Sequence, residues 1–186
     1  HVGQDEIIAG QQAGLKFNAM GVKHVLCPIQ EANNVGLQDR CKGLSQTFKG
    51  KTTNFNLDGG LADLTAASAK IKAALQADSS IDAVFALNAD IAAKAVLPAA
   101  TDLGLSLKIG TVDMSPEALD AIEAGTMEFA IDQQQYAQGY MSVVLLYLAL
   151  TNGNELGGGA PVYSGPGFVT KDNVANVKTL VAAGTR

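Results

Sequence analysis

The sequence predicts an α/β fold in which a parallel sheet carries helices on both faces. Short apolar or β-branched segments alternate with longer stretches of helical periodicity, and glycine, proline or a capping residue marks most of the boundaries. Strands separated by helices form βαβ units, which pair in parallel and place their helices over the sheet. Apolar residues make up 47% of the chain and aromatic residues only 5%, without tryptophan. We therefore expect an aliphatic core.

In the first half of the chain, glycines and apolar runs set the boundaries of the elements. The expected helices run over about Asp5–Met20, Val35–Lys49 and Leu61–Ala77, and the expected strands over His24–Ile29, Thr52–Leu57 and Ala83–Leu87. Gly21 and Gly50 follow the first two helices, where glycine commonly ends a helix. The third helix has Leu61, Leu64, Ile71 and Leu75 on one face.

In the second half, the strongest local signal is a helix start at Ser115. Ser115 is an N-cap residue, Pro116 suits the first helical position, and Gly125 ends the helix. Pro98 falls inside an expected helix and should kink or split it, because an unrelieved interior proline costs about 3 kcal/mol. The remaining expected elements are helices at Asp90–Leu103 and Tyr136–Leu150, and strands at Lys108–Val112, Glu128–Ile131 and Val162–Ser164, with a glycine-rich loop at Gly153–Gly159.

The charge pattern argues against several classes of partner. The net charge is −5, and lysine and arginine do not cluster. The chain therefore has no basic patch of the kind that binds nucleic acid or anionic lipid. The apolar run Met141–Leu150 is shorter than the roughly 20 residues that a membrane span needs. We expect no metal site, because no metal-ligand spacing is present, and no cofactor.

Polar side chains follow nearly every expected strand. They are Gln30, Glu31, Asp58, Asn88, Asp90, Asp113, Asp132 and Gln133. The carboxyl ends of parallel strands share one edge of the sheet, outside which ligands bind. Carboxylates and amides without matching cations suit a neutral polyhydroxylated ligand, because each hydroxyl both donates and accepts. The alternative is that residues such as Asp58, Asp90 and Asp132 merely cap the following helices.

Enzyme motifs are weak. The only histidines are His1 and His24, and we expect His24, at the start of a strand, to be a surface or edge residue. There is no nucleophile-elbow motif and no evident Ser/His/Asp set. The segment Gly50-Lys51-Thr52 leads from helix to strand, which is the reverse of a phosphate-binding loop. Gly157–Gly159 does not open a helix after a strand.

Six stretches, in order, resemble the periplasmic sugar-binding proteins of ABC transporters, of the type I, ribose-binding-like class. They are HVGQDEIIAG, NNVGLQDRCKGL, IDAVFALNAD, IGTVDMSPEALDAIEAG, FAIDQQQYAQGY and YSGPGFVTKDNV. The resemblance implies two Rossmann-like lobes joined by three crossing segments, which close on a sugar. It implies that this chain is the carboxy-terminal part and begins near the first crossing, at His1–Asp5.

The resemblance also divides the chain. Residues 1–132 would form the carboxy-terminal ligand-binding lobe, residues 133–162 a hinge crossing and a helix of the missing amino-terminal lobe, and residues 163–186 the third crossing and a tail. The helix Tyr136–Leu150 is apolar almost all round, and such a helix must be buried on several sides. We expect it to pack on the missing lobe or on a second copy.

Sugar contacts follow from the resemblance by position. Arg40 would offer the donors of its guanidinium, Asn88 would both donate and accept, and Asp113 would accept from two hydroxyls as charge-assisted bonds. Gln133 matches the glutamine at the second crossing, although Gln134 and Gln135 blur the register. Glu31 is placed at the cleft by spacing alone.

We predict a disulfide between Cys27 and Cys41. Cys27 lies near the end of a strand and Cys41 near the start of the following helix, two points that a βα unit can bring within bridging distance. The periplasm that the resemblance implies is oxidising, so the bond would persist. The alternative is a pair of buried free thiols.

The function that the resemblance implies is reversible binding of a monosaccharide or polyol and its delivery to a membrane permease in the periplasm, without chemistry. Two alternatives stay open. One is the sugar-effector domain of a LacI-type transcription repressor, which shares this fold, although the cysteines and the VTKDNV ending favour the transporter protein. The other is a small α/β enzyme whose catalytic residues lie elsewhere.

Overall fold

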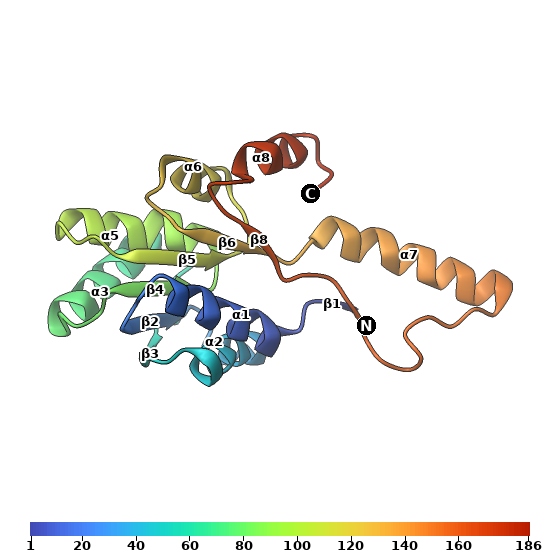
Figure 1. Cartoon of the computed structure of the whole chain (residues 1–186), viewed down its shortest axis with the longest axis horizontal. Coiled ribbons are helices and arrows are strands. Elements are labelled where there is room, and N and C mark those ends of the chain that lie inside the picture. Colours follow the sequence, from blue (N-terminus) through green and yellow to red (C-terminus); the bar gives the residue numbers. More distant parts are fainter.

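A six-stranded sheet forms the centre of the computed structural model, which describes residues 1–186 (Figure 1). In spatial order its strands are β3 (Lys51–Asn56), β2 (His24–Ile29), β4 (Ala83–Ala86), β5 (Lys108–Val112), β6 (Phe129–Asp132) and β8 (Gly167–Val169). Neighbouring strands are parallel except β6 and β8, which are antiparallel. The predicted parallel α/β sheet is confirmed, and the antiparallel edge strand β8 was not predicted.

Helices cover both faces of this sheet. One face carries α1 (Glu6–Ala19) and α2 (Val35–Thr47), and the other carries α3 (Leu64–Ala77), α4 (Ala89–Ile91), α5 (Leu97–Asp102), α6 (Pro116–Ala124) and α8 (Val174–Ala182). In β2, Leu26 packs toward the second group, whereas Val25 and Cys27 pack toward α1 and α2. This alternation follows from the two-residue repeat of a strand.

The core differs between the two faces. Toward α3 to α6 the buried residues are aliphatic or methionine, as predicted. Toward α1 and α2 they include Phe17, Phe85 and Phe129, with the ring centroids of Phe17 and Phe129 5.3 Å apart. Here the expectation of a purely aliphatic core was wrong, because all the buried phenylalanines belong to the cluster between the sheet and α1 and α2.

Glycine brings α1 and α2 into backbone contact. A Cβ atom added to Gly10 would lie 2.0 Å from the carbonyl oxygen of Arg40, and one added to Gly43 would lie 2.1 Å from that of Ile7. Neither distance leaves room for a methyl group. The two helices therefore have a fixed separation, which positions Glu6 of α1 relative to Arg40 of α2.

The proline inside the fourth helical segment is accommodated by a π-helical turn. Ala92–Val96 forms this turn between α4 and α5, and the Leu97 N–H donates to the carbonyl of Ala92, five residues earlier. Pro98 follows at the start of α5, where its missing N–H costs little. The sequence predicted a kink or split at Pro98, and the structure has a single π-helical turn just before it, an irregularity of the kind that accompanies kinks in helices.

The segment after residue 163 is structured. Strand β7 (Val162–Tyr163) pairs in parallel with β1 (Val2–Gly3) outside the main sheet. The chain then returns to the lobe through β8 and α8, whose Val174 and Val177 are buried in the core. Residues 163–186, which the resemblance made the third crossing and a tail, thus contain a strand and a helix that were not predicted.

Helix α7 (Gln135–Asn152) projects away from the sheet and buries none of its residues (Figure 1). Leu146 is 63% exposed and Leu150 is 85% exposed. The predicted apolar helix is present, and this chain leaves most of its surface uncovered. No helix of the structure is both long and apolar enough to span a membrane.

Candidate ligand-binding site

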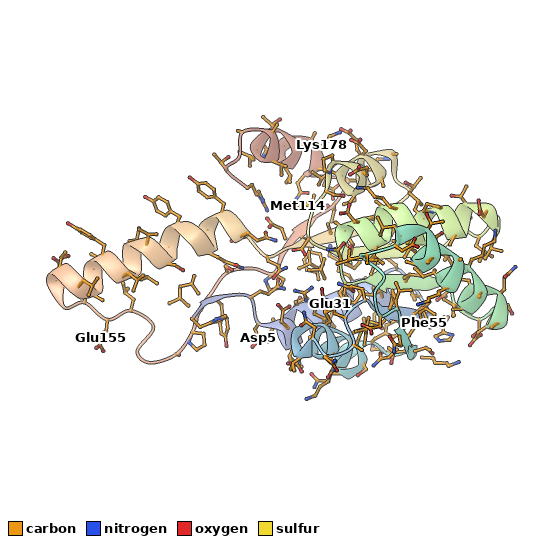
Figure 2. The ribbon with its side chains drawn as sticks, turned by 180° about the vertical axis from the view of Figure 1, so that it is seen from behind. Asp5, Glu31, Phe55, Met114, Glu155 and Lys178 are labelled. Atoms are coloured by element: carbon orange, nitrogen blue, oxygen red, sulfur yellow. A yellow bond between two sulfur atoms is a disulfide. The ribbon has the colours of Figure 1, made fainter.

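The topology predicts a crevice at the carboxyl edge of the sheet, between β2 and β4. After β2 the chain passes through α2 on one face to β3, and then through α3 on the other face to β4. Where the winding reverses in this way, the helices diverge and leave room for a ligand. Figure 2 shows Glu31 and Met114, the neighbour of Asp113, on the side of the lobe from which α7 leaves.

Arg40 lies buried beneath this crevice, with only 6% of its surface exposed. Its Nε and Nη2 donate to the two carboxylate oxygens of Glu6, at 2.6 and 3.0 Å. Its Nη1 donates to the Leu87 carbonyl, at 3.1 Å, immediately after β4. The structure thus places Arg40 at the predicted edge of the sheet, where Glu6 and the Leu87 carbonyl already hold its guanidinium. Glu6 was not singled out from the sequence.

The predicted disulfide is present, and it braces Arg40. Cys27 lies in β2 and Cys41 in α2, with Cα atoms 6.1 Å apart and both side chains buried. The bond joins the strand that ends at the crevice to the residue next to Arg40. The disulfide therefore holds the middle of α2, next to Arg40, against the sheet.

Asn88 serves as a helix cap. Its Oδ1 accepts from the backbone N–H groups of Asp90 and Ile91, at 2.9 and 3.3 Å. The side chain is half-buried at the carboxyl end of β4, and its amide N–H groups have no partner within the chain. Asn88 can therefore donate to a ligand while its oxygen holds the turn.

Asp113 accepts hydrogen bonds from amides of the segment that joins β6 to α7. Its Oδ1 accepts from the Nε2 atoms of Gln133, at 2.6 Å, and Gln135, at 2.7 Å. Asp113 and Gln134 are the two non-glycine residues with positive φ, at 68° and 60°. Such backbone is uncommon outside glycine and often marks functional sites. The structure thus brings Asp113 and Gln133 together and leaves Oδ2 of Asp113 without a partner in the chain.

Gln135, which was not predicted from the sequence, joins the cluster around Asp113. Three consecutive glutamines, Gln133–Gln135, indicated that an amide side chain lies at this point. The sequence alone could not decide which of the three reaches the site. In the structure the left-handed residue Gln134 turns the chain so that the side chains on both sides of it reach the same carboxylate.

Glu31 stands apart from this cluster, in an open hollow that it lines with Asn34 and Asp58. Its Oε2 accepts from Asn34 Nδ2 at 2.8 Å, and Asp58 accepts from the Ala32 N–H at 3.2 Å. Both carboxylates are exposed. The structure does not join Glu31 to Arg40 or to Asp113 by any hydrogen bond.

The carboxylates Asp58, Asp90 and Asp132 do not cap the helices that follow them. The side-chain caps of α3 and α4 are Asp63 and Asn88. Asp90 instead forms an ion pair with Lys94, at 3.0 Å, and the hydrogen bonds that Lys94 donates to Asp90 and Glu117 raise its pKa. Asp132 is fully buried, pairs with Arg186 and accepts from the Gln134 N–H.

One Ser–His–Asp grouping exists, at the opposite edge of the sheet. The ring nitrogens of His24 lie 2.8 Å from Ser80 Oγ and 2.8 Å from Thr53 Oγ1. The Ser80 hydroxyl donates to Asp78, so the imidazole does not withdraw its proton. Burial, followed by the nearby Lys51, lowers the pKa of His24. His24 is only 2% exposed, so the expectation of a surface residue was wrong. No group of three His, Cys, Asp or Glu side chains is placed to hold a metal ion.

Comparisons with known proteins agree with this architecture. Residues 1–155 match the family model described as a periplasmic binding protein domain. A carbohydrate transporter protein from Acidothermus cellulolyticus, solved in complex with myo-inositol, is 45% identical with a TM-score of 0.91, over 100% of this chain and 64% of that one. No curated protein matches the chain.

More distant solved structures show the same fold. An arabinose-binding protein from Geobacillus stearothermophilus has a TM-score of 0.78 at 20% identity, over 94% of this chain and 64% of its own. An ABC transporter solute-binding protein from Actinobacillus succinogenes with bound D-allose has a TM-score of 0.77 at 22% identity, over 94% and 62%. The chain thus spans slightly less than two thirds of the length of these structures.

Proposed function

Because this chain belongs to the periplasmic binding protein family, we propose that it binds a neutral polyol or monosaccharide reversibly and that an ABC transporter permease receives the ligand from it. The observation that carries the proposal is the Asp113 carboxylate, which two amides hold by one oxygen while the other oxygen remains free. The similarity to a protein solved with myo-inositol makes that cyclic polyol the first candidate ligand.

The proposed contacts follow from the chemistry of hydroxyl groups. Asp113 would accept from ligand hydroxyls, and Asn88, Gln133 and the remaining N–H groups of Arg40 would donate to ligand oxygens. Glu31 would act at the rim. Such a set recognises a ring that carries several hydroxyls and needs no covalent step. Membership of the family and the disulfide both support a periplasmic or other extracytoplasmic location.

We expect ligand binding to be detectable by thermal shift. At a ligand concentration about 100-fold above Kd, binding stabilises a protein by roughly 2.7 kcal/mol, which corresponds to roughly 5–10 °C in Tm for a chain of this size. The screen should include myo-inositol, pentoses and hexoses, with recovered ligand analysed by NMR. A shift with unchanged ligand supports the proposal, whereas conversion of the ligand, or no shift with any compound, contradicts it.

We also propose that the chain contributes to two lobes. Residues 1–132 would form one lobe, with β8 and α8 returning to it, and residues 133–162 would cross to a second lobe that covers α7. The exposed apolar surface of α7 supports this arrangement, because contiguous apolar patches of this kind usually mark an interface. Closure of the lobes would trap the ligand at the carboxyl edge.

Substituting Leu146 with aspartate tests whether α7 is covered. In the protein encoded by the complete gene, L146D should lower the free energy of unfolding by about 1.5–3 kcal/mol or more, because a buried leucine is lost and a charge is buried. Leu15, which is 50% exposed on α1, gives the matched control L15D, with an expected loss below about 1 kcal/mol. Equal losses in urea unfolding would contradict a covering lobe. A dimer in light scattering would assign the cover to a second copy.

A further inference from the structure

We propose that Glu6 sets the charge selectivity of the ligand site. Glu6 fixes the guanidinium of Arg40 and cancels its charge, so that the site accepts neutral polyols and rejects sugars that carry a carboxylate or a phosphate. This inference rests on the proposed function and adds the class of ligand that the site excludes.

The contact between Glu6 and Arg40 is bidentate. Nε of Arg40 donates to Oε2 of Glu6, at 2.6 Å, and Nη2 donates to Oε1, at 3.0 Å. This fork-to-fork arrangement is the strongest geometry that an arginine and a carboxylate can adopt. The side chains are 8% and 24% exposed, so solvent screens the pair only weakly. Gln4 Nε2 also donates to Oε2, at 3.0 Å, and holds the carboxylate from its other side.

Arg40 keeps some capacity for a ligand. A guanidinium has five N–H donors, and three of those of Arg40 are occupied by Glu6 and the Leu87 carbonyl. One N–H remains on each terminal nitrogen. These two donors can contact ring or hydroxyl oxygens, but the positive charge behind them is already matched by Glu6. Arg40 therefore acts as an oriented pair of donors without a net charge to offer an anion.

The other charges near the crevice reinforce this selectivity. Asp113, Glu31 and Asp58 have no cationic partner among the ion pairs of the chain, whereas Arg186 is matched by Asp132. An anionic ligand would meet carboxylates without a free cation to compensate them, and like charges brought together at an interface disfavour binding. Neutral hydroxyls meet no such penalty.

The backbone fixes where the pair can sit. Glu6 is in the first turn of α1, Arg40 lies in α2, and the contacts at Gly10 and Gly43 hold these two helices together. The Cys27–Cys41 disulfide anchors α2 to β2. Neither residue can shift much to suit a charged ligand, so the selectivity is built into the fold.

The variant Glu6→Gln tests the inference, because it removes the charge and keeps the shape. The complete protein is titrated calorimetrically with myo-inositol as the neutral probe and D-glucuronate as an anionic six-membered ring. We expect E6Q to raise the ratio of glucuronate affinity to inositol affinity by about tenfold or more. The control Asp39→Asn removes one negative charge from α2 beside Arg40, where Asp39 forms no ion pair, and should leave that ratio within about twofold.

The results distinguish the role of Glu6 from the proposed binding of polyols. If the wild type binds inositol and E6Q leaves the ratio unchanged, the role of Glu6 is overturned and the proposed function stands. If the wild type binds no neutral polyol, both fail. If E6Q does not fold, Glu6→Asp keeps the charge on a shorter side chain and should still reject glucuronate, although it binds inositol more weakly. Binding of glucuronate by the folded E6D variant would overturn the inference.

Discussion

Replacing Asp113 with asparagine is expected to weaken polyol binding by about ten- to a hundredfold. Hydrogen bonds to a charged group contribute about 1.5–3 kcal/mol each in net terms, and every 1.4 kcal/mol is a tenfold change in Kd. Asparagine keeps the volume of the side chain and tolerates positive φ, which the backbone has here at 68°. The loss therefore reports on the charge of the carboxylate and not on a strained turn.

Isothermal titration with the ligand found in the thermal-shift screen measures this effect. Asp102, an exposed residue paired with Lys72, gives the matched control D102N, whose affinity should equal that of the wild type. D113A should bind more weakly still, because alanine also loses the amide partners and adapts poorly to the left-handed backbone. If D113N retains wild-type affinity, Asp113 is not a ligand residue.

Removing the disulfide is expected to lower the free energy of unfolding by about 3 kcal/mol. Cys27 and Cys41 are 14 residues apart, and cross-linking a loop of about 15 residues stabilises by roughly this amount through the entropy of the unfolded chain. Alanine is the suitable replacement at both positions, because the side chains are 0% and 1% exposed and serine would bury unpaired hydroxyls.

Urea unfolding of the C27A/C41A variant, with and without a reductant, measures the contribution. The wild type should lose stability when the reductant is added, and the variant should not respond to it. Because Arg40 adjoins Cys41, ligand affinity should also fall in the variant. Equal unfolding free energies for oxidised wild type and variant would show that the bond contributes nothing to the stability of the lobe.

The sequence supported the layout of the sheet well. His24–Ile29 and Lys108–Val112 have the predicted bounds, because each is a short apolar run enclosed by turn residues. Helix α6 also has its predicted ends, since Ser115 accepts from the Ala118 N–H and Gly125 adopts positive φ. Local chemistry decides all of these features.

The parts that could not be predicted depend on contacts between distant residues. Glu6 and Arg40 are 34 positions apart, and Asp113 and Gln135 are 22 apart; no local pattern pairs them. His24 looked like an edge residue, but Ser80 and Thr53 from neighbouring segments enclose its ring. The placement of α8 likewise depends on the exposed flank of α6, to which Lys178 is tied through Asp120 and Glu123.

The glycine contact between α1 and α2 has a mechanical consequence. Helix α1 begins shortly after strand β1, and its backbone touches that of α2 at Gly10 and Gly43, with no side chain between the two backbones. Close-packed backbone has low compressibility and transmits displacement. A displacement of α1 is therefore transmitted to α2 and to Arg40 with little loss. Any residue larger than glycine at these two positions would separate the helices and weaken this coupling.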